Sequence, residues 1–171
     1  MRSLQTPRLH LVPQCAEHAQ ALFDVLADPR MYLHEGEPPQ SPAWLRERLT
    51  KLETRRSADG SEQWLNWVVM MTSGRAVGYV QATVQADGTA YVAYMFGSAW
   101  WGQGLASEAV SAMMDELAAQ HGATRLRAVL KTSNQRSLRL LQGLHFMAAE
   151  AEDIDADERM LQRAIPAVPA P

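Results

Sequence analysis

Residues 90–117 read AYVAYMFGSAWWGQGLASEAVSAMMDEL. The apolar residues at 90–97 predict a β-strand, Gly102 and Gly104 predict a turn, and residues 105–121 have the spacing of an amphipathic helix. Two glycines let the backbone approach a ligand closely, and the N–H groups of a first helical turn attract anions. The stretch therefore predicts a site for a phosphate or pyrophosphate, although glycines before a helix also serve as plain turns.

Two known phosphate motifs do not fit this turn. A mononucleotide P-loop places Lys and then Ser or Thr directly after its last glycine, where this chain has Leu105 and Ala106. A dinucleotide-binding fingerprint has a third glycine near position 107, which is Ser107 here. A different anion site is expected.

The composition is that of one globular domain. The chain has 171 residues, of which 47% are apolar and 20% charged, so we expect a single domain over 1–165 and a disordered tail at 166–171. The net charge of -3 predicts no nucleic-acid partner. Scattered histidines and a single cysteine predict no metal site, and the lack of a long apolar run predicts no membrane partner and a cytoplasmic location.

Periodicity and turn residues predict seven strands and four helices. The predicted strands are 8–12, 64–72, 76–84, 89–96, 125–131, 145–150 and 158–165, and the helices are 16–27, 42–56, 105–121 and one capped by 132–134 that ends near 144. The three middle strands are expected to be antiparallel, and the helix at 105–121 predicts that the strands on its two sides are parallel. The expected fold is α/β (α+β), a mixed and mostly antiparallel sheet of six to seven strands flanked by about four helices.

This arrangement resembles the GCN5-related N-acetyltransferase (GNAT) family over nearly the whole chain. Within the family it is similar to the ribosomal-protein N-terminal acetyltransferases and their small-molecule relatives. The resemblance rests on TPRLHLVP at 6–13, WWGQGLASEAV at 100–110 and NQRSLRLLQGLHF at 134–146.

Both motifs of the resemblance match in part. The family's acyl-CoA signature is Gln or Arg, two variable residues, Gly, one variable residue, then Gly or Ala; Gly104 and Ala106 match it, while Trp101 occupies its first position. The matches in the second segment are Asn134, Ser137, Leu140 and Phe146. Near its end, Gly143 and His145 replace the more usual Lys and Gly.

The resemblance implies acetyl-CoA as cosubstrate and no metal. It implies that backbone N–H groups at 102–106 hold the pyrophosphate and that the main chain of the strand at 94–96 holds the pantetheine arm. Arginines in a segment without acidic residues, 123–149, are candidates for the 3′-phosphate. The predicted cofactor-binding residues are Tyr94, Met95, Phe96, Trp101, Gly102, Gln103, Gly104, Leu105, Ala106, Ser107, Asn134, Arg136, Ser137 and Arg139.

The sequence identifies the general acid and the general base less clearly than the cofactor-binding residues. Many family members have Tyr seven residues after the Asn, where this chain has Leu141, and the resemblance suggests Ser137 as the substitute acid. Many also have Glu at the position of Tyr91. A loop before the second helix offers candidates for the base, namely His34, Glu35 and Glu37. Ser137 and Glu35 are our predicted catalytic residues.

The sequence thus predicts an acetyl-CoA-dependent N-acetyltransferase that acts on a primary amine by direct attack in a ternary complex. The acceptor can be a protein N-terminus, a polyamine, an amino acid or an amino sugar, with specificity expected in loops 31–41 and 84–90 and in the final hairpin. The chain is expected to be a monomer or a homodimer. Two alternatives stay open: a non-catalytic acyl-CoA-binding module, and a nucleotide-binding domain outside this family.

Overall fold

The computed structural model describes residues 1–34, 36–151 and 154–165. The strands are β1 Leu4–Gln5, β2 Leu9–Pro13, β3 Glu62–Met71, β4 Ala76–Gln85, β5 Thr89–Phe96, β6 Arg125–Lys131, β7 Met147–Ala149 and β8 Glu158–Ala164. The α-helices are α1 Ala19–Leu26, α2 Pro42–Leu52, α3 Leu105–Gln120 and α4 Gln135–Gly143. Short 3₁₀ helices are η1 Ala16–His18, η2 Pro29–Tyr32 and η3 Ser98–Trp100.

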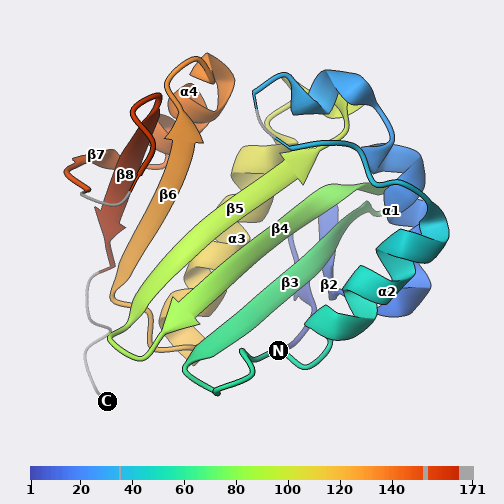
Figure 1. Ribbon diagram of the computed structural model, residues 1–171, viewed down its shortest axis with the longest axis horizontal. Helices are drawn as coiled ribbons and strands as arrows, with labels where there is room; N and C mark the ends of the chain where they lie inside the picture. Colours follow the sequence, from blue (N-terminus) through green and yellow to red (C-terminus); the bar gives the residue numbers. More distant parts are fainter. Residues whose placement is uncertain (35, 152–153, 166–171) are drawn as a thin grey trace.

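All the described strands form one sheet in the order β1-β2-β3-β4-β5-β6-β8-β7. Neighbouring strands are antiparallel except β5 and β6, which run parallel. The helix α3 connects these two strands and passes behind the sheet in Figure 1, while α2 lies in front of it. The predicted mixed, mostly antiparallel α/β fold and its parallel crossover are confirmed. The short edge strand β1 was not predicted.

Two predicted helix boundaries were wrong. The helix expected over 42–56 ends at Leu52, because the chain turns at Arg55, whose φ of 59° is incompatible with a helix, and Arg56 then bridges to Gln63 of β3. The helix expected over 16–27 is the 3₁₀ turn η1 followed by α1. The tail predicted to be disordered, 166–171, lies outside the described residues.

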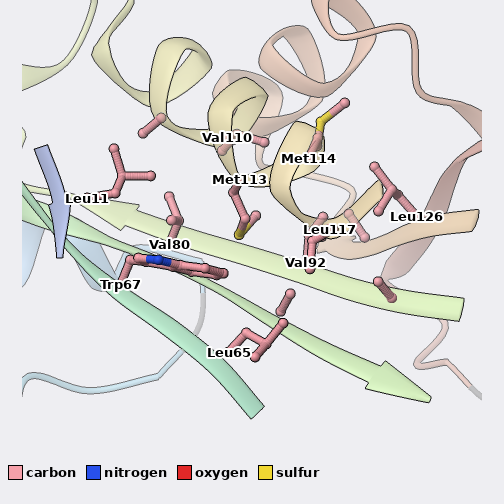
Figure 2. Packing of buried hydrophobic residues seen from close by; sticks show 14 of the residues in the cluster. Leu11, Leu65, Trp67, Val80, Val92, Val110, Met113, Met114, Leu117 and Leu126 are labelled. Carbon is pink, nitrogen blue, oxygen red and sulfur yellow. The ribbon is translucent and has the colours of Figure 1, made fainter. Parts of the chain in front are cut away.

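The larger hydrophobic core lies between the sheet and α3. Figure 2 shows Met113 of α3 reaching down toward Trp67 of β3 and Val80 of β4. Trp67 is fully buried, and its indole Nε1 donates to the Arg2 carbonyl at 2.9 Å. Burying the ring therefore leaves no polar atom of the side chain without a partner.

A second hydrophobic cluster covers the opposite face of the sheet. It joins Leu22 of α1 and Leu45 of α2 to Val68 of β3. Because successive side chains of a strand point to opposite faces, neighbouring residues of β5 serve different clusters: Tyr94 packs against the α3 side and Met95 against the α1 side.

The strands β4 and β5 approach each other closely at Gly78. A Cβ atom at this position would lie 2.1 Å from the Met95 carbonyl oxygen and 2.9 Å from the Phe96 Cα. These are backbone atoms, which cannot rotate away as a flexible side chain can. Only glycine fits here without moving β5.

We predict that Gly78→Ala lowers the free energy of unfolding by roughly 3 kcal/mol, the range of overpacking in a tight interior. Urea denaturation measures this loss. The matched control is Gly143→Ala in α4, where an added Cβ has no neighbour within 4 Å; alanine there should leave stability unchanged or raise it by up to about 1 kcal/mol. Equal urea midpoints for the two variants would contradict the prediction.

Candidate active site

A cleft opens where β5 and β6 separate. The two strands are paired only at Thr89–Arg125, Ala90–Leu126 and Tyr91–Arg127, and Figure 1 shows them diverging beyond this point. The cleft has a volume of about 370 Å³ and is lined by β5, β6, α4 and the loop around η2. The carboxyl ends of parallel strands are a common place for ligand sites in α/β sheets.

The edge of β5 presents main-chain groups to this cleft. Gly97 N–H donates to the Val77 carbonyl of β4 at 2.9 Å, so alternation along the strand directs the main chain of Met95 to β4 and that of Tyr94 and Phe96 to the cleft. The Phe96 carbonyl accepts from the Trp101 indole at 2.7 Å. The main-chain groups of Tyr94 and the Phe96 N–H therefore remain for a ligand, and Met95 offers its side chain.

The glycine turn adopts the backbone conformation that the two glycines suggest. Gly102 and Gly104 both have φ of 75°, in the left-handed region that other residues rarely enter. Among the described residues, none accepts a hydrogen bond from the N–H groups of 104–107, which are the cap residue and the first three residues of α3. These N–H groups and the helix dipole form a cradle suited to an anion.

The N-terminal segment holds this cradle in place through Glu108. The Glu108 carboxylate accepts from the Thr6 hydroxyl at 2.6 Å, from Arg8 N–H at 3.0 Å and from Arg8 Nε at 2.7 Å. Arg8 also donates to the Gln103 carbonyl at 2.9 Å. The desolvation of Glu108 raises its pKa, but these hydrogen bonds outweigh it and the net pKa is lowered. Arg8 thus brings a positive charge beside Gly104. A Cβ atom added at Gly104 would lie 3.5 Å from Nη2 of the Arg8 guanidinium.

Trp101 links the glycine turn to α4. The Arg136 guanidinium lies over the Trp101 ring, 3.5 Å from its centroid, while the indole Nε1 bonds to β5. Stacking and a fixed hydrogen bond hold the ring between the two sides of the cleft. Arg139 lines the same cleft.

Tyr94 and Ser137 meet across the cleft. Their hydroxyl oxygens are 2.6 Å apart, joining β5 to α4. Ser137 is held in the first turn of α4, where its N–H donates to the Asn134 side chain at 3.1 Å; Asn134 is therefore the helix cap that its sequence position suggests. Burial raises the pKa of Tyr94 to about 12, and its hydrogen bond to Ser137 offsets only part of this effect.

The structure places the candidate bases in different parts of the molecule. His34 Nδ1 is 3.0 Å from the Ser133 hydroxyl, so His34 spans the mouth of the cleft from the η2 loop to the start of α4. Glu37 lines a separate hollow, and Glu35 lies outside the described residues. Tyr91, which occupies the position of the usual Glu, accepts from Arg127 at 3.3 Å. Of the residues described around the cleft, none is an Asp or Glu.

Most predicted site residues come together. Those that line the cleft are Tyr94, Met95, Phe96, Trp101, Ala106, Asn134, Arg136, Ser137 and Arg139. The others form the adjoining glycine turn and first turn of α3: Gly102, Gln103, Gly104, Leu105 and Ser107. Leu105 is 2% exposed, so its side chain belongs to the core and only its backbone faces the cradle.

One expected acceptor loop is far from the cleft. Gly88, in the loop 84–90, packs against Gly122 and Thr124 before β6. This loop precedes β5, whereas the cleft lies at the opposite, carboxyl end of that strand. The loop 31–41, in contrast, contributes residues to the cleft, including Met31 and His34.

The role of Arg8 and the side-chain contact of Tyr94 were missed by sequence reasoning. TPRLHLVP carried the resemblance, but nothing local indicates that Arg8 pairs with a residue 100 positions away. For Tyr94, alternation along β5 is the signal that places its side chain on the α3 side.

The family model described as an acetyltransferase (GNAT) domain matches residues 8–147, which include β5, the glycine turn and α4. The chain belongs to the GNAT acetyltransferase family. The resemblance given by the motifs is thus confirmed at the level of the family, whose members use acetyl-CoA in general.

Individual relatives agree with this assignment. The chain is 26% identical over 148 residues to the uncharacterized N-acetyltransferase p20 of Bacillus licheniformis, covering 85% of this chain and 83% of that protein. The ribosomal L7/L12 α-N-protein acetyltransferase RimL in complex with coenzyme A has a TM-score of 0.80 at 20% identity, covering 95% of this chain and 97% of its own. The aminoglycoside acetyltransferase AAC(6')-Ib in complex with coenzyme A has a TM-score of 0.75 at 17% identity, covering 93% and 96%.

These two structures share the GNAT fold with this chain, and their names give different acceptors. The fold therefore does not select between a protein N-terminus and a small amine. Within the part of the chain that the structure describes, no cluster of His, Cys, Asp and Glu is suited to a metal ion, and no helix is long and apolar enough to cross a membrane.

The shifted Tyr94 predicts a loss of stability at alkaline pH. An unfolded tyrosine ionises near pH 10 and native Tyr94 near pH 12, so its contribution to stability is present below pH 10 and is lost as the pH rises to 12. Tyr94→Phe removes this dependence. Between pH 9.5 and 11.5, wild type should lose about 2 kcal/mol more unfolding free energy than Tyr94→Phe in urea denaturation. If the unfolding free energy falls by the same amount in the two proteins, Tyr94 has the same pKa in the folded and the unfolded chain, and the prediction is wrong.

Proposed function

We propose that this chain transfers an acetyl group from acetyl-CoA to a primary amine by direct attack in a ternary complex. The observation that carries the proposal is the cleft between β5 and β6 with an unpaired helix N-terminus beside it. An acyl-CoA needs both parts, a cradle for its pyrophosphate and a slot for its pantetheine arm.

The cradle residues bind the pyrophosphate through backbone N–H groups. Gly102 has open space around its Cβ position, and the N–H groups of 104–107 are available at the positive end of α3. Arg8 supplies a nearby guanidinium. Arg136 and Arg139 lie on the α4 side of the cleft, where they can reach the 3′-phosphate.

The free edge of β5 holds the pantetheine arm as an added strand would be held. The main-chain groups of Tyr94 are directed to the cleft, and the Phe96 carbonyl is already bound to Trp101. The N–H groups of this edge also polarise the thioester carbonyl.

Ser137 donates a hydrogen bond to the departing sulfur, and Tyr94 positions Ser137. A phenol with a pKa of about 12 is a weaker acid than an alkyl thiol, whose pKa is about 8.5. An aliphatic hydroxyl is a weaker acid still, so Tyr94 and Ser137 both keep their protons. Tyr94 orients the Ser137 hydroxyl, and the proton that neutralises the sulfur comes from the attacking amine. Glu35 stays a candidate base from its sequence position, and His34 is a second one because it spans the cleft mouth.

The other candidate is a non-catalytic acyl-CoA-binding module of the same fold. It is favoured by one observation: among the described residues that line the cleft there is no carboxylate to act as base. Cofactor binding without turnover would distinguish it from an enzyme.

The first test is calorimetric titration with acetyl-CoA. We expect saturable binding, weakened at least tenfold in Gly104→Val because the added side chain blocks close approach to the cradle. The matched control is Gly60→Val, which has the same φ of 75° with open space around it and lies outside the cleft. An affinity that is equal in both variants would remove the cradle from the proposal.

The second test is kinetic. Ser137→Ala should lower kcat by about a hundredfold, the range for loss of one hydrogen-bond donor to a developing anion, with little change in KM for acetyl-CoA. Tyr94→Phe should lower kcat by a smaller factor, about tenfold, because it only positions Ser137. Release of the free thiol from acetyl-CoA in the presence of an amine measures both. A kcat that is the same in all three proteins would exclude the proposed role of Ser137.

A further inference from the structure

A second hollow lies on the other face of the sheet from α3. It has a volume of about 340 Å³ and is lined by α1, α2, β4 and the segment after η2. Met95 lines both this hollow and the cleft. Met95 packs on the α1 side and its neighbour Tyr94 on the α3 side, so Met95 is a wall that the hollow and the cleft share at this point of β5.

The walls of the hollow are aromatic and aliphatic. Tyr32, Trp44 and Tyr79 contribute rings, and leucines of α1 and α2 fill the space between them. The Tyr32 hydroxyl donates to the Leu26 carbonyl at 2.9 Å, so its ring is fixed with its polar end satisfied. Burial raises the pKa of Tyr32 to about 12, as expected of a phenol in an apolar setting.

The charges of the described residues that line the hollow are balanced. Among its described lining residues the charged ones are Glu37 and Arg48, one of each sign, and the Arg48 guanidinium lies 5.8 Å from the Trp44 ring centroid. A polyamine or an amino sugar carries several positive charges and needs several carboxylates. A single ammonium with an apolar group fits this lining better.

We propose that this hollow binds the side group of the acceptor, and that the acceptor is a primary amine with one positive charge and one aromatic group. This rests on the proposed function, since the ammonium must reach the cleft at Met95 while the aromatic group packs against Tyr32 and Trp44. Two sources share this chemistry, a small arylalkylamine and a polypeptide whose first residue is aromatic.

The binding test uses calorimetry without acetyl-CoA, so that it does not depend on turnover. The probes are 2-phenylethylamine, the C-terminally amidated peptide Phe-Ala-Ala with a free N-terminus, spermidine and kanamycin. We expect one or both aromatic amines to bind more tightly than either polycation, and the stronger of the two identifies the source. Tighter binding of spermidine or kanamycin, or no binding of either aromatic amine, would overturn the proposal.

One variant and its control test whether the aromatic amine binds in this hollow. Trp44, which is 38% exposed at the rim, can be removed with little cost to the core, and Trp44→Ala should weaken aromatic-amine binding about tenfold, the value of one aromatic contact with its buried area. The matched control is Trp64→Ala in β3, outside both spaces, which should leave affinity unchanged. Equal affinities of Trp44→Ala and wild type would locate the aromatic group elsewhere and refute the proposal.

An isosteric charge change tests the electrostatic argument. Gln81 of β4 lines the hollow, and Gln81→Glu adds a carboxylate of the same size. The ratio of spermidine to 2-phenylethylamine affinity should rise at least fivefold, and an unchanged ratio would contradict the charge-based selection. Failure of acetyl-CoA to bind would instead refute the proposed function, whereas aromatic-amine binding with this ratio change would still support the hollow as an amine site.

Discussion

The separation of β5 from β6 is the constraint on which the rest of the structure depends. After three paired residues, the inner edge of β5 loses the hydrogen-bond partner that a sheet normally provides, and buried backbone groups without partners cost about 1 to 3 kcal/mol each. Side chains replace part of the missing strand: the Trp101 indole binds the Phe96 carbonyl, and the Tyr94 hydroxyl reaches Ser137 of α4. These contacts hold the gap open at a fixed width while leaving main-chain groups available to a ligand.

The glycine turn depends on a different kind of support. A helix N-terminus that leaves its N–H groups free has no side-chain cap to fix the preceding loop, and Gly104 at the cap position provides none. The support comes instead from the other end of the chain, through Glu108 with Thr6 and Arg8. The turn between β1 and β2, which contains Thr6 and Arg8, thus contributes to the candidate site although these two strands lie far from β5 in the sheet order.

The predictable features were those with a local signal. The strand at 89–96, the glycines at positive φ and the cap at Asn134 each follow from residue type and spacing, and the crossover helix fixed the parallel pair. Contacts between distant segments, such as Tyr94 with Ser137, have no such signal, because a strand pattern gives the face of a side chain but not its partner. The position of loop 84–90 was predictable in retrospect: it precedes β5, and a site at the carboxyl ends of parallel strands lies at the other end. His145 stands where the family more usually has glycine, which indicates a backbone position with positive φ. Its φ is 62°, but this conformation was not predicted from the sequence.

The alternation of β5 has a consequence for how such a protein can change its acceptor. Tyr94 and Met95 are adjacent in sequence yet face different helices, so the cradle with α3 and α4 and the hollow with α1 and α2 are built from separate sets of side chains. Met95 lines both spaces, and the segment around η2 contributes residues to each. Asp28 ties this segment to Ser98 near the glycine turn. Substitutions in sites that share few contacts have nearly additive effects. If the hollow holds the amine and the glycine turn the cofactor, as proposed, residues of α1 and α2 can vary with the amine while those around Gly104 stay fitted to one cofactor. This division is consistent with a single fold whose relatives are named for acceptors as different as a ribosomal protein and an aminoglycoside.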